Sequence, residues 1–225
     1  MRKKMKTRHL TFLAFAFLFP GPAAPALDGT VVYTDGRVSI YRDSDVMDAD
    51  IGMTVVETDV IETGEGSFAV IDLGGGAEVK LRESTRLALE ALGEKITVQL
   101  AAGGVFSRVK QKLNDHYFVK AEAVSAGVRG TDFFVAFGRT IDETPDVWLC
   151  VNDGSVEVNI DETDQKTIVE AGEGINIVAG SKLTRPRFYP WTKKLNWNMD
   201  PSSGMVADRT DLDEAYSDLL DQDYD

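Results

Sequence analysis

Apolar and polar residues alternate in short segments over residues 30–178, and turns that contain glycine separate these segments. In the clearest one, 77–82, Lys80 and Arg82 are expected to face water and the apolar residues a core, because successive side chains of a strand point to opposite faces. About twelve such segments predict an all-β fold, in one domain over residues 27–180.

Two of the turns have the composition of tight hairpins. Asp35-Gly36 and Asn152-Asp153-Gly154 each stand between two alternating segments. Since Asp-Gly readily adopts the positive φ angles of two-residue hairpin turns, each is expected to join two paired strands.

A five-residue pattern occurs twice. Residues 62–66 read Glu-Thr-Gly-Glu-Gly and residues 170–174 read Glu-Ala-Gly-Glu-Gly, each before a segment of strand character. Either two similar turns arose independently or the chain contains a structural repeat, and a short fixed period would be expected of a true repeat architecture.

The first 26 residues have the pattern of a secretory signal peptide. Five basic residues precede an apolar run at 10–19, and a small-residue cleavage signal ends at Ala26. The run is about half the length that a transmembrane helix needs. We therefore expect cleavage near Ala26, a periplasmic or secreted protein, and no membrane insertion.

The net charge limits the classes of binding partner, and the cysteine content limits disulfide formation. Five of the 24 basic residues lie in the predicted signal peptide, so 19 remain against 37 acids, a net charge of −18. Such a surface disfavours nucleic acids and anionic membranes. Cys150 is the one cysteine, so no internal disulfide forms, and its apolar neighbours predict a buried, inert thiol.

The composition changes after Gly180. Residues 181–204 form an aromatic, proline-punctuated segment with a predicted linker at 201–204, and residues 205–225 form an acidic tail. Thr210 is expected to cap a short helix in the tail. The aromatic segment either contacts a partner or covers one open end of the β domain, and its candidate contact residues are Phe188, Tyr189, Trp191 and Trp197.

Catalytic side chains are scarce. His116 is the one histidine beyond the predicted signal peptide, and its polar neighbours predict a surface loop. Acidic groups at 43–50 and 161–164 lack the glycine and terminal glutamate of a calcium loop. No cofactor, no metal and no enzymatic activity are expected. A carbohydrate-active enzyme stays an alternative, because carboxylate pairs are built across strands, and so does weak cation binding by the acidic surface.

Residues 124–135, Val-Ser-Ala-Gly-Val-Arg-Gly-Thr-Asp-Phe-Phe-Val, resemble the v-R-G-T-x-F-x-V core of the FecR domain family. Further stretches resemble the family in the same order, and together they cover about residues 29–178: these are 52–64, 67–76, 81–89, 103–106 and 151–158. The resemblance implies a β-solenoid-like or sandwich-like domain.

The motif residues are Gly127, Arg129, Gly130, Thr131 and Phe133. We interpret them as structural, because the glycines permit tight backbone and the arginine can bridge carbonyls or a carboxylate; direct ligand contact is the alternative.

FecR regulators place an anti-sigma segment and a membrane helix before this domain, whereas a signal peptide is predicted there in this chain. The expected function is therefore an exported, non-enzymatic binding or scaffolding module with an envelope protein or a glycan as partner. A periplasmic sensor or regulatory component of a signalling system is the alternative.

Overall fold

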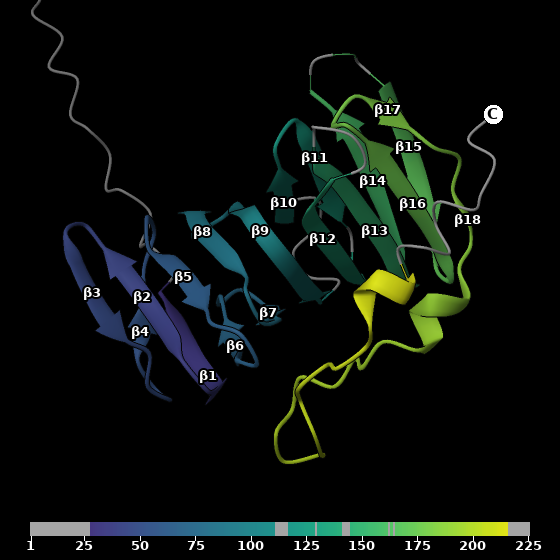
Figure 1. Ribbon diagram of the computed structural model, residues 1–225. Coiled ribbons are helices and arrows are strands. Elements are labelled where there is room, and N and C mark those ends of the chain that lie inside the picture. The colour runs from purple at the N-terminus through teal and green to yellow at the C-terminus, as the bar shows by residue number, and fades with distance from the viewer. Residues whose placement is uncertain are drawn as a thin grey trace, which may run out of the picture.

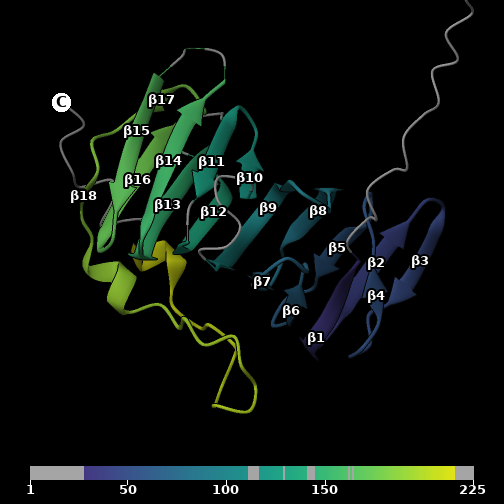
Figure 2. The same cartoon turned by 180° about the vertical axis from the view of Figure 1, so that it is seen from behind.

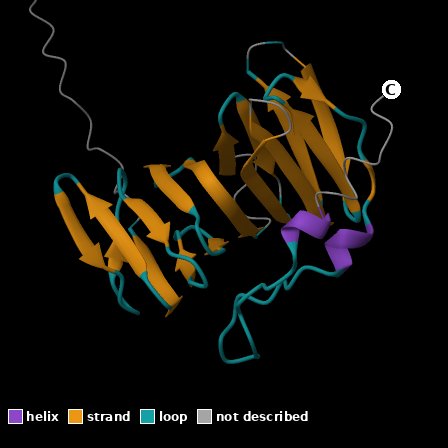
Figure 3. Cartoon of the chain, viewed as in Figure 1, coloured by secondary structure: helices purple, strands orange, loops and turns teal. Residues whose placement is uncertain are grey.

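The computed structural model describes residues 28–110, 117–128, 130–140, 145–161, 163 and 165–215. The predicted signal peptide, His116, Arg129 and the end of the acidic tail lie outside these ranges. The all-β prediction is confirmed, since strands dominate these ranges and helix is limited there to a 3₁₀ turn at 190–193 and one turn at 212–215 (Figure 3). Within the described ranges, no helix is long and apolar enough to span a membrane.

Eighteen strands are linked by hydrogen bonds into one open sheet that is folded into two layers (Figure 1). The strands are β1 (Gly29–Asp35), β2 (Val38–Arg42), β3 (Asp45–Asp48), β4 (Thr54–Val55), β5 (Val60–Thr63), β6 (Phe68–Asp72), β7 (Ala77–Leu81), β8 (Arg86–Ala91), β9 (Ile96–Val109), β10 (Tyr117–Ala121), β11 (Val124–Val128), β12 (Asp132–Thr140), β13 (Pro145–Asp153), β14 (Ser155–Ile160), β15 (Gln165–Glu170), β16 (Glu173–Val178), β17 (Lys182–Leu183) and β18 (Arg187–Phe188).

The first layer runs in the order β4-β1-β6-β7-β9-β12-β13-β16, with β17 and β18 on its far edge. The second runs in the order β3-β2-β5-β8-β9-β10-β11-β14-β15. Both views of the ribbon show the layers progressing from β1–β4 at one end to β13–β18 at the other (Figures 1 and 2).

Both predicted hairpins are wrong in the same way. The strands on either side of Asp35-Gly36 do not pair, because β1 belongs to the first layer and β2 to the second. The strands around Asp153-Gly154, β13 and β14, are likewise in different layers. Gly36 and Gly154 do have positive φ angles, of 75° and 81°. The turn chemistry was thus correct, but the turns are corners between layers.

Strand β9 passes through both layers. Residues 96–102 pair in the second layer, and from Gly103, with φ of 85°, the strand pairs in the first. Strand β10 then lies parallel to the first half of β9, with Tyr117 opposite Ile96. The fold therefore combines a mostly antiparallel sandwich with one solenoid-like coil.

The core lies between the two layers. Alternate residues of both layers meet there and are fully buried; examples are Val31, Ile71 and Val79 of the first layer and Ile40, Ile61 and Leu87 of the second. The predicted alternation in β7 is confirmed on this side, because Ala77, Val79 and Leu81 are buried.

Candidate functional site

The outer face of the first layer is also apolar, and the C-terminal segment, residues 186–215, covers it. Five aromatic rings form a row across this face: Trp197, Phe106 (β9), Phe134 (β12), Trp148 (β13) and Tyr189. Their centroids are 5.2, 4.5, 5.4 and 6.2 Å apart in that order. The two outer rings come from the C-terminal segment, so it closes the row at both ends.

The four aromatic candidates are therefore not one exposed surface. Tyr189 and Trp191 are 1% and 2% exposed. Trp191 is the second residue of the 3₁₀ helix η2 (Pro190–Lys193). Trp197 is half-buried and donates its Nε1–H to the carbonyl of Thr192. Phe188 is 63% exposed. The segment covers a sheet face rather than an open end, because β12 and β13 carry buried apolar side chains on both faces.

Lys80 does not face water as the alternation predicted. It is fully buried on β7, and its Nζ donates to the carbonyls of Asn196, Asn198 and Val206. The ammonium also lies 4.2 Å from the centroid of the Phe106 ring. Burial lowers the pKa of Lys80 from 10.5 to about 8, with Asp208 opposing that shift.

Two arginines also bind the C-terminal segment to the sheet. Arg82 is 5% exposed, donates to the carbonyl of Thr210 at 2.9 Å, and lies 3.2 Å from the Asp208 carboxylate. Arg108 donates to the carbonyl of Trp197 and pairs with Asp132. These bonds fix the backbone of the C-terminal segment. A guanidinium or ammonium can satisfy several carbonyls at once, which an apolar side chain at these positions could not do.

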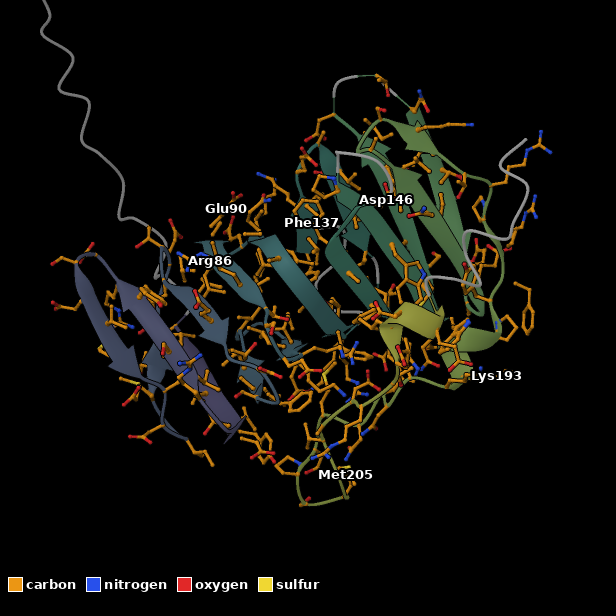
Figure 4. All side chains as sticks on the ribbon, in the orientation of Figure 1. Arg86, Glu90, Phe137, Asp146, Lys193 and Met205 are labelled. Carbon is orange, nitrogen blue, oxygen red and sulfur yellow. The ribbon has the colours of Figure 1, made fainter. Side chains whose placement is uncertain are left out.

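The predicted linker at 201–204 is an ordered turn. The Asp200 carboxylate accepts from the backbone N–H of Ser202, and Ser203 donates to Asn198 Oδ1. The turn projects away from the strands, with Met205 near its tip (Figure 4). The chain on both sides of the turn packs on the sheet, so the acidic tail begins as part of the β domain.

A short helix lies at residues 212–215, directly after the stretch that packs on the sheet. Its cap is Asp211 and not Thr210, because the Asp211 carboxylate accepts from the N–H groups of Asp213 and Glu214. Thr210 instead donates to the carbonyl of Lys194. A helix was correctly predicted here; its cap was placed one residue early.

An open groove of about 970 Å³ lies where the C-terminal segment meets the corners of the sheet. Its walls are the β5–β6 corner at Glu65, the β7–β8 corner at Glu83, the bend of β9 at Gly103 and residues 209–213 of the C-terminal segment. Phe137 of β12, labelled in Figure 4 near the middle of the molecule, lies in it half-buried. The groove is the candidate site, because it joins strands and tail.

The sequence reasoning missed this groove. A bulge in β12 between Phe137 and Arg139 interrupts the pairing with β13, and Gly138 there has a φ of 106°. Bulges redirect side chains and occur often beside functional sites. Phe137 packs against the core on the same side as Phe133, as the strand alternation predicts, and is only partly buried there; Gly138 after it was the available signal for the bulge.

The FecR-like motif lies at another corner, between β11 and β12. Gly130 has a φ of 64°, and Thr131 is buried, with its Oγ1 donating to the carbonyl of Ser155 at 2.8 Å. Phe133 is fully buried in the core. A Cβ on Gly127 would lie 3.2 Å from the Phe118 ring. These positions are packed, and Arg129 lies outside the described residues.

Other candidate groups have structural surroundings. Cys150 is fully buried, and burial raises the pKa of its thiol. Over the residues that the structure describes, no group of three or more His, Cys, Asp or Glu side chains could hold a metal ion. Asp59, in a stretch that resembles the FecR family, is buried and accepts both hydrogen bonds of a bidentate pair from Arg42 at 2.7 Å.

Two crystal structures of a protein described as a "putative anti-sigma factor" from Parabacteroides distasonis ATCC 8503, at 1.65 and 2.50 Å resolution, are similar to this chain. Each is 19% identical, with a TM-score of 0.47, and the alignment covers 57% of this chain and 59% of the other. The chain thus matches less than two thirds of that protein's length. No curated protein matches the chain.

The family comparison agrees with the resemblance in the sequence. The family model described as "FecR protein" matches residues 59–157, which extend from β5 to β14 and include the bend of β9 and the corner at Gly130. The match is consistent with a FecR domain-containing protein.

Proposed function

We propose that this chain is a non-enzymatic binding module that acts as a sensory or regulatory component in the cell envelope, and that it binds its partner protein in the groove. The FecR family match supports the regulatory role. The signal-peptide pattern supports export to the periplasm or the cell surface.

One observation carries the proposal. The groove has the corners of the sheet on one side and residues 209–213 on the other. A partner in it therefore touches the FecR domain and the C-terminal segment together. Because Lys80 and Arg82 hold that segment to the sheet, binding in the groove is coupled to how the tail is attached.

The acids of the groove also bear on the hydrolase alternative. Glu83 accepts a hydrogen bond from the backbone N–H of Gly66, and Asp211 caps the helix at 212–215. Each carboxylate thus supports local structure. We therefore favour recognition over catalysis as the role of this groove.

Photo-crosslinking in the native envelope tests the proposal. A photoreactive phenylalanine analogue replaces Phe137 in one chain and Ile168 in another; Ile168 is 54% exposed on β15, outside the groove. We expect one protein to be crosslinked from position 137 and not from 168, as identified by mass spectrometry. Equal products from both positions, or none from 137, would contradict the proposal.

Point variants are preferable to truncation here. A chain ending at Lys182 would lack the whole C-terminal segment and expose Phe106, Phe134 and Trp148. Such an apolar face captures proteins non-specifically. Single substitutions in the groove avoid this artefact.

A further inference from the structure

The geometry points to an extended, basic segment of a partner protein as the occupant of the groove, with Lys or Arg residues on either side of an apolar side chain. We infer this from the floor, the rim and the charge of the groove. The inference rests on the proposed function, since it names the chemistry of the partner for the same groove.

The floor offers an apolar contact. Phe137 and Leu212 are both half-buried and come from opposite walls, β12 and the C-terminal segment. Glycines at 103, 104 and 138 line the groove beside them, so main chain rather than side chains forms part of the surface. An extended peptide suits such a site, because one apolar side chain can enter while its backbone lies along the glycines.

The rim is acidic on both sides. Glu65 and Glu83 stand on the sheet corners, and Asp211 and Asp213 stand on the C-terminal segment. Of the two arginines in the lining, Arg82 is buried against Asp208, whereas Arg209 is exposed. Carboxylates therefore outnumber exposed cations on the rim.

The charge of the chain extends this preference. Four further aspartates follow the helix in the sequence, at 218, 221, 223 and 225. A basic segment is complementary to this charge, and an acidic one would be repelled, which supplies specificity and a faster encounter.

Binding of two defined peptides to the full mature chain tests the inference. The basic probe is fluorescein-labelled Gly-Lys-Leu-Lys-Gly-Lys-Leu-Lys-Gly, and the acidic probe has Glu in place of every Lys. Fluorescence anisotropy should show binding of the basic probe alone, weakening as salt rises from about 50 to about 300 mM. Equal binding of both probes, or no binding of the basic one, overturns the inference.

A pair of charge-matched variants locates the site. Glu65→Gln with Glu83→Gln removes two rim charges, and the amide introduced in place of the Glu83 carboxylate keeps an acceptor for the Gly66 N–H. Asp48→Asn with Glu94→Gln removes two exposed charges outside the groove. The groove pair should weaken the basic probe about fivefold and the control pair should not. Equal weakening by both would show attraction by overall charge alone, against the inference.

The crosslinking experiment at position 137 distinguishes failure of this inference from failure of the proposed function on which it rests. If a partner is captured there and its crosslinked segment lacks Lys and Arg, the groove binds a protein but the inferred chemistry is wrong. If no partner is captured, the proposed function itself fails.

Discussion

Two basic side chains of this protein are buried at positions where strand alternation predicts exposure to water. Lys80 and Arg82 do alternate with the core residues of β7, as the pattern requires, yet both are buried. Their face of the sheet is covered by the C-terminal segment, whose carbonyls they bind. These two charged side chains thus attach the C-terminal segment to the sheet.

Titration of Lys80 should be visible in stability. Its pKa is about 8 when folded and 10.5 ordinarily, so between these values the unfolded chain binds more protons and stability rises with pH. Relative to Lys80→Met, the wild type should gain up to about 3 kcal/mol from pH 7.5 to about 10.5, as measured by urea unfolding. A difference between the two proteins that does not change with pH would contradict the assigned burial.

The comparison with Lys80→Met is needed because Cys150 acts in the opposite direction. Its pKa is raised by burial, so above about pH 8.5 the unfolded thiol loses its proton first and stability falls. Both proteins contain Cys150, so its contribution cancels.

Asp59 should be important for stability. It is fully buried, and it accepts hydrogen bonds from Arg42 and from the backbone N–H of Val56. We expect Asp59→Ala to lower the free energy of unfolding by about 3 kcal/mol, because a donor and a guanidinium lose their acceptor. Glu62→Ala, which breaks the exposed pair with Arg86, serves as a control and should cost under about 1 kcal/mol. Equal losses would contradict this account.

Corners determine the architecture at the level of the strands. The repeated pattern at 62–66 and 170–174 occurs at two corners of the same kind, since β5 to β6 and β15 to β16 both pass from the second layer to the first. The backbones differ, however. Gly66 has a positive φ in the first corner, whereas Gly172 does in the second. Equivalent roles therefore accompany different turns.

Gly154 should tolerate no side chain. Its φ is 81°, and a Cβ would lie 2.5 Å from the carbonyl oxygen of Gly130 in the neighbouring corner. Gly154→Ala should therefore destabilise the protein by at least about 2 kcal/mol in thermal or urea unfolding. Gly93→Ala is the control, because a Cβ there meets nothing within 4 Å. Similar melting temperatures for both variants would show that the two corners are not in contact.

The protein as a whole depends on the C-terminal segment as a cover. Its buried rings pack on β12 and β13, and cations of β7 and β9 bind its backbone. Phe106, Phe134 and Trp148 would otherwise face solvent. The segment thus completes the domain and also supplies a wall of the groove.

Two aromatics of this segment should differ sharply. Trp191 is 2% exposed and Phe188 is 63% exposed. Trp191→Ala should cost about 3 kcal/mol and increase the binding of a hydrophobic dye, whereas Phe188→Ala should change stability by under about 1 kcal/mol. A small effect of Trp191→Ala would mean that the segment does not stabilise the sheet. Phe188 is exposed and therefore accessible to a partner, and its role in partner contact stays a prediction.

Local chemistry allowed much of the fold to be predicted. The period of two in 77–82 indicated a strand, Asp-Gly pairs indicated turns, and acids near 211 indicated a helix start. The v-R-G-T stretch indicated the FecR domain, which the family match confirms. These features depend on neighbours in the chain, because strand alternation and turn angles are set within a few residues.

The rest depended on residues far apart in the chain. Local patterns were sufficient to specify an all-β, acidic FecR-domain chain, but packing of the two layers decided which strands pair around Asp35-Gly36 and Asp153-Gly154. The burial of Lys80 depends on residues 116 or more positions away, and the groove exists only where the corners meet residues 209–213. Burial is a property of assembled surfaces, so it follows from the three-dimensional packing and not from neighbours in the chain.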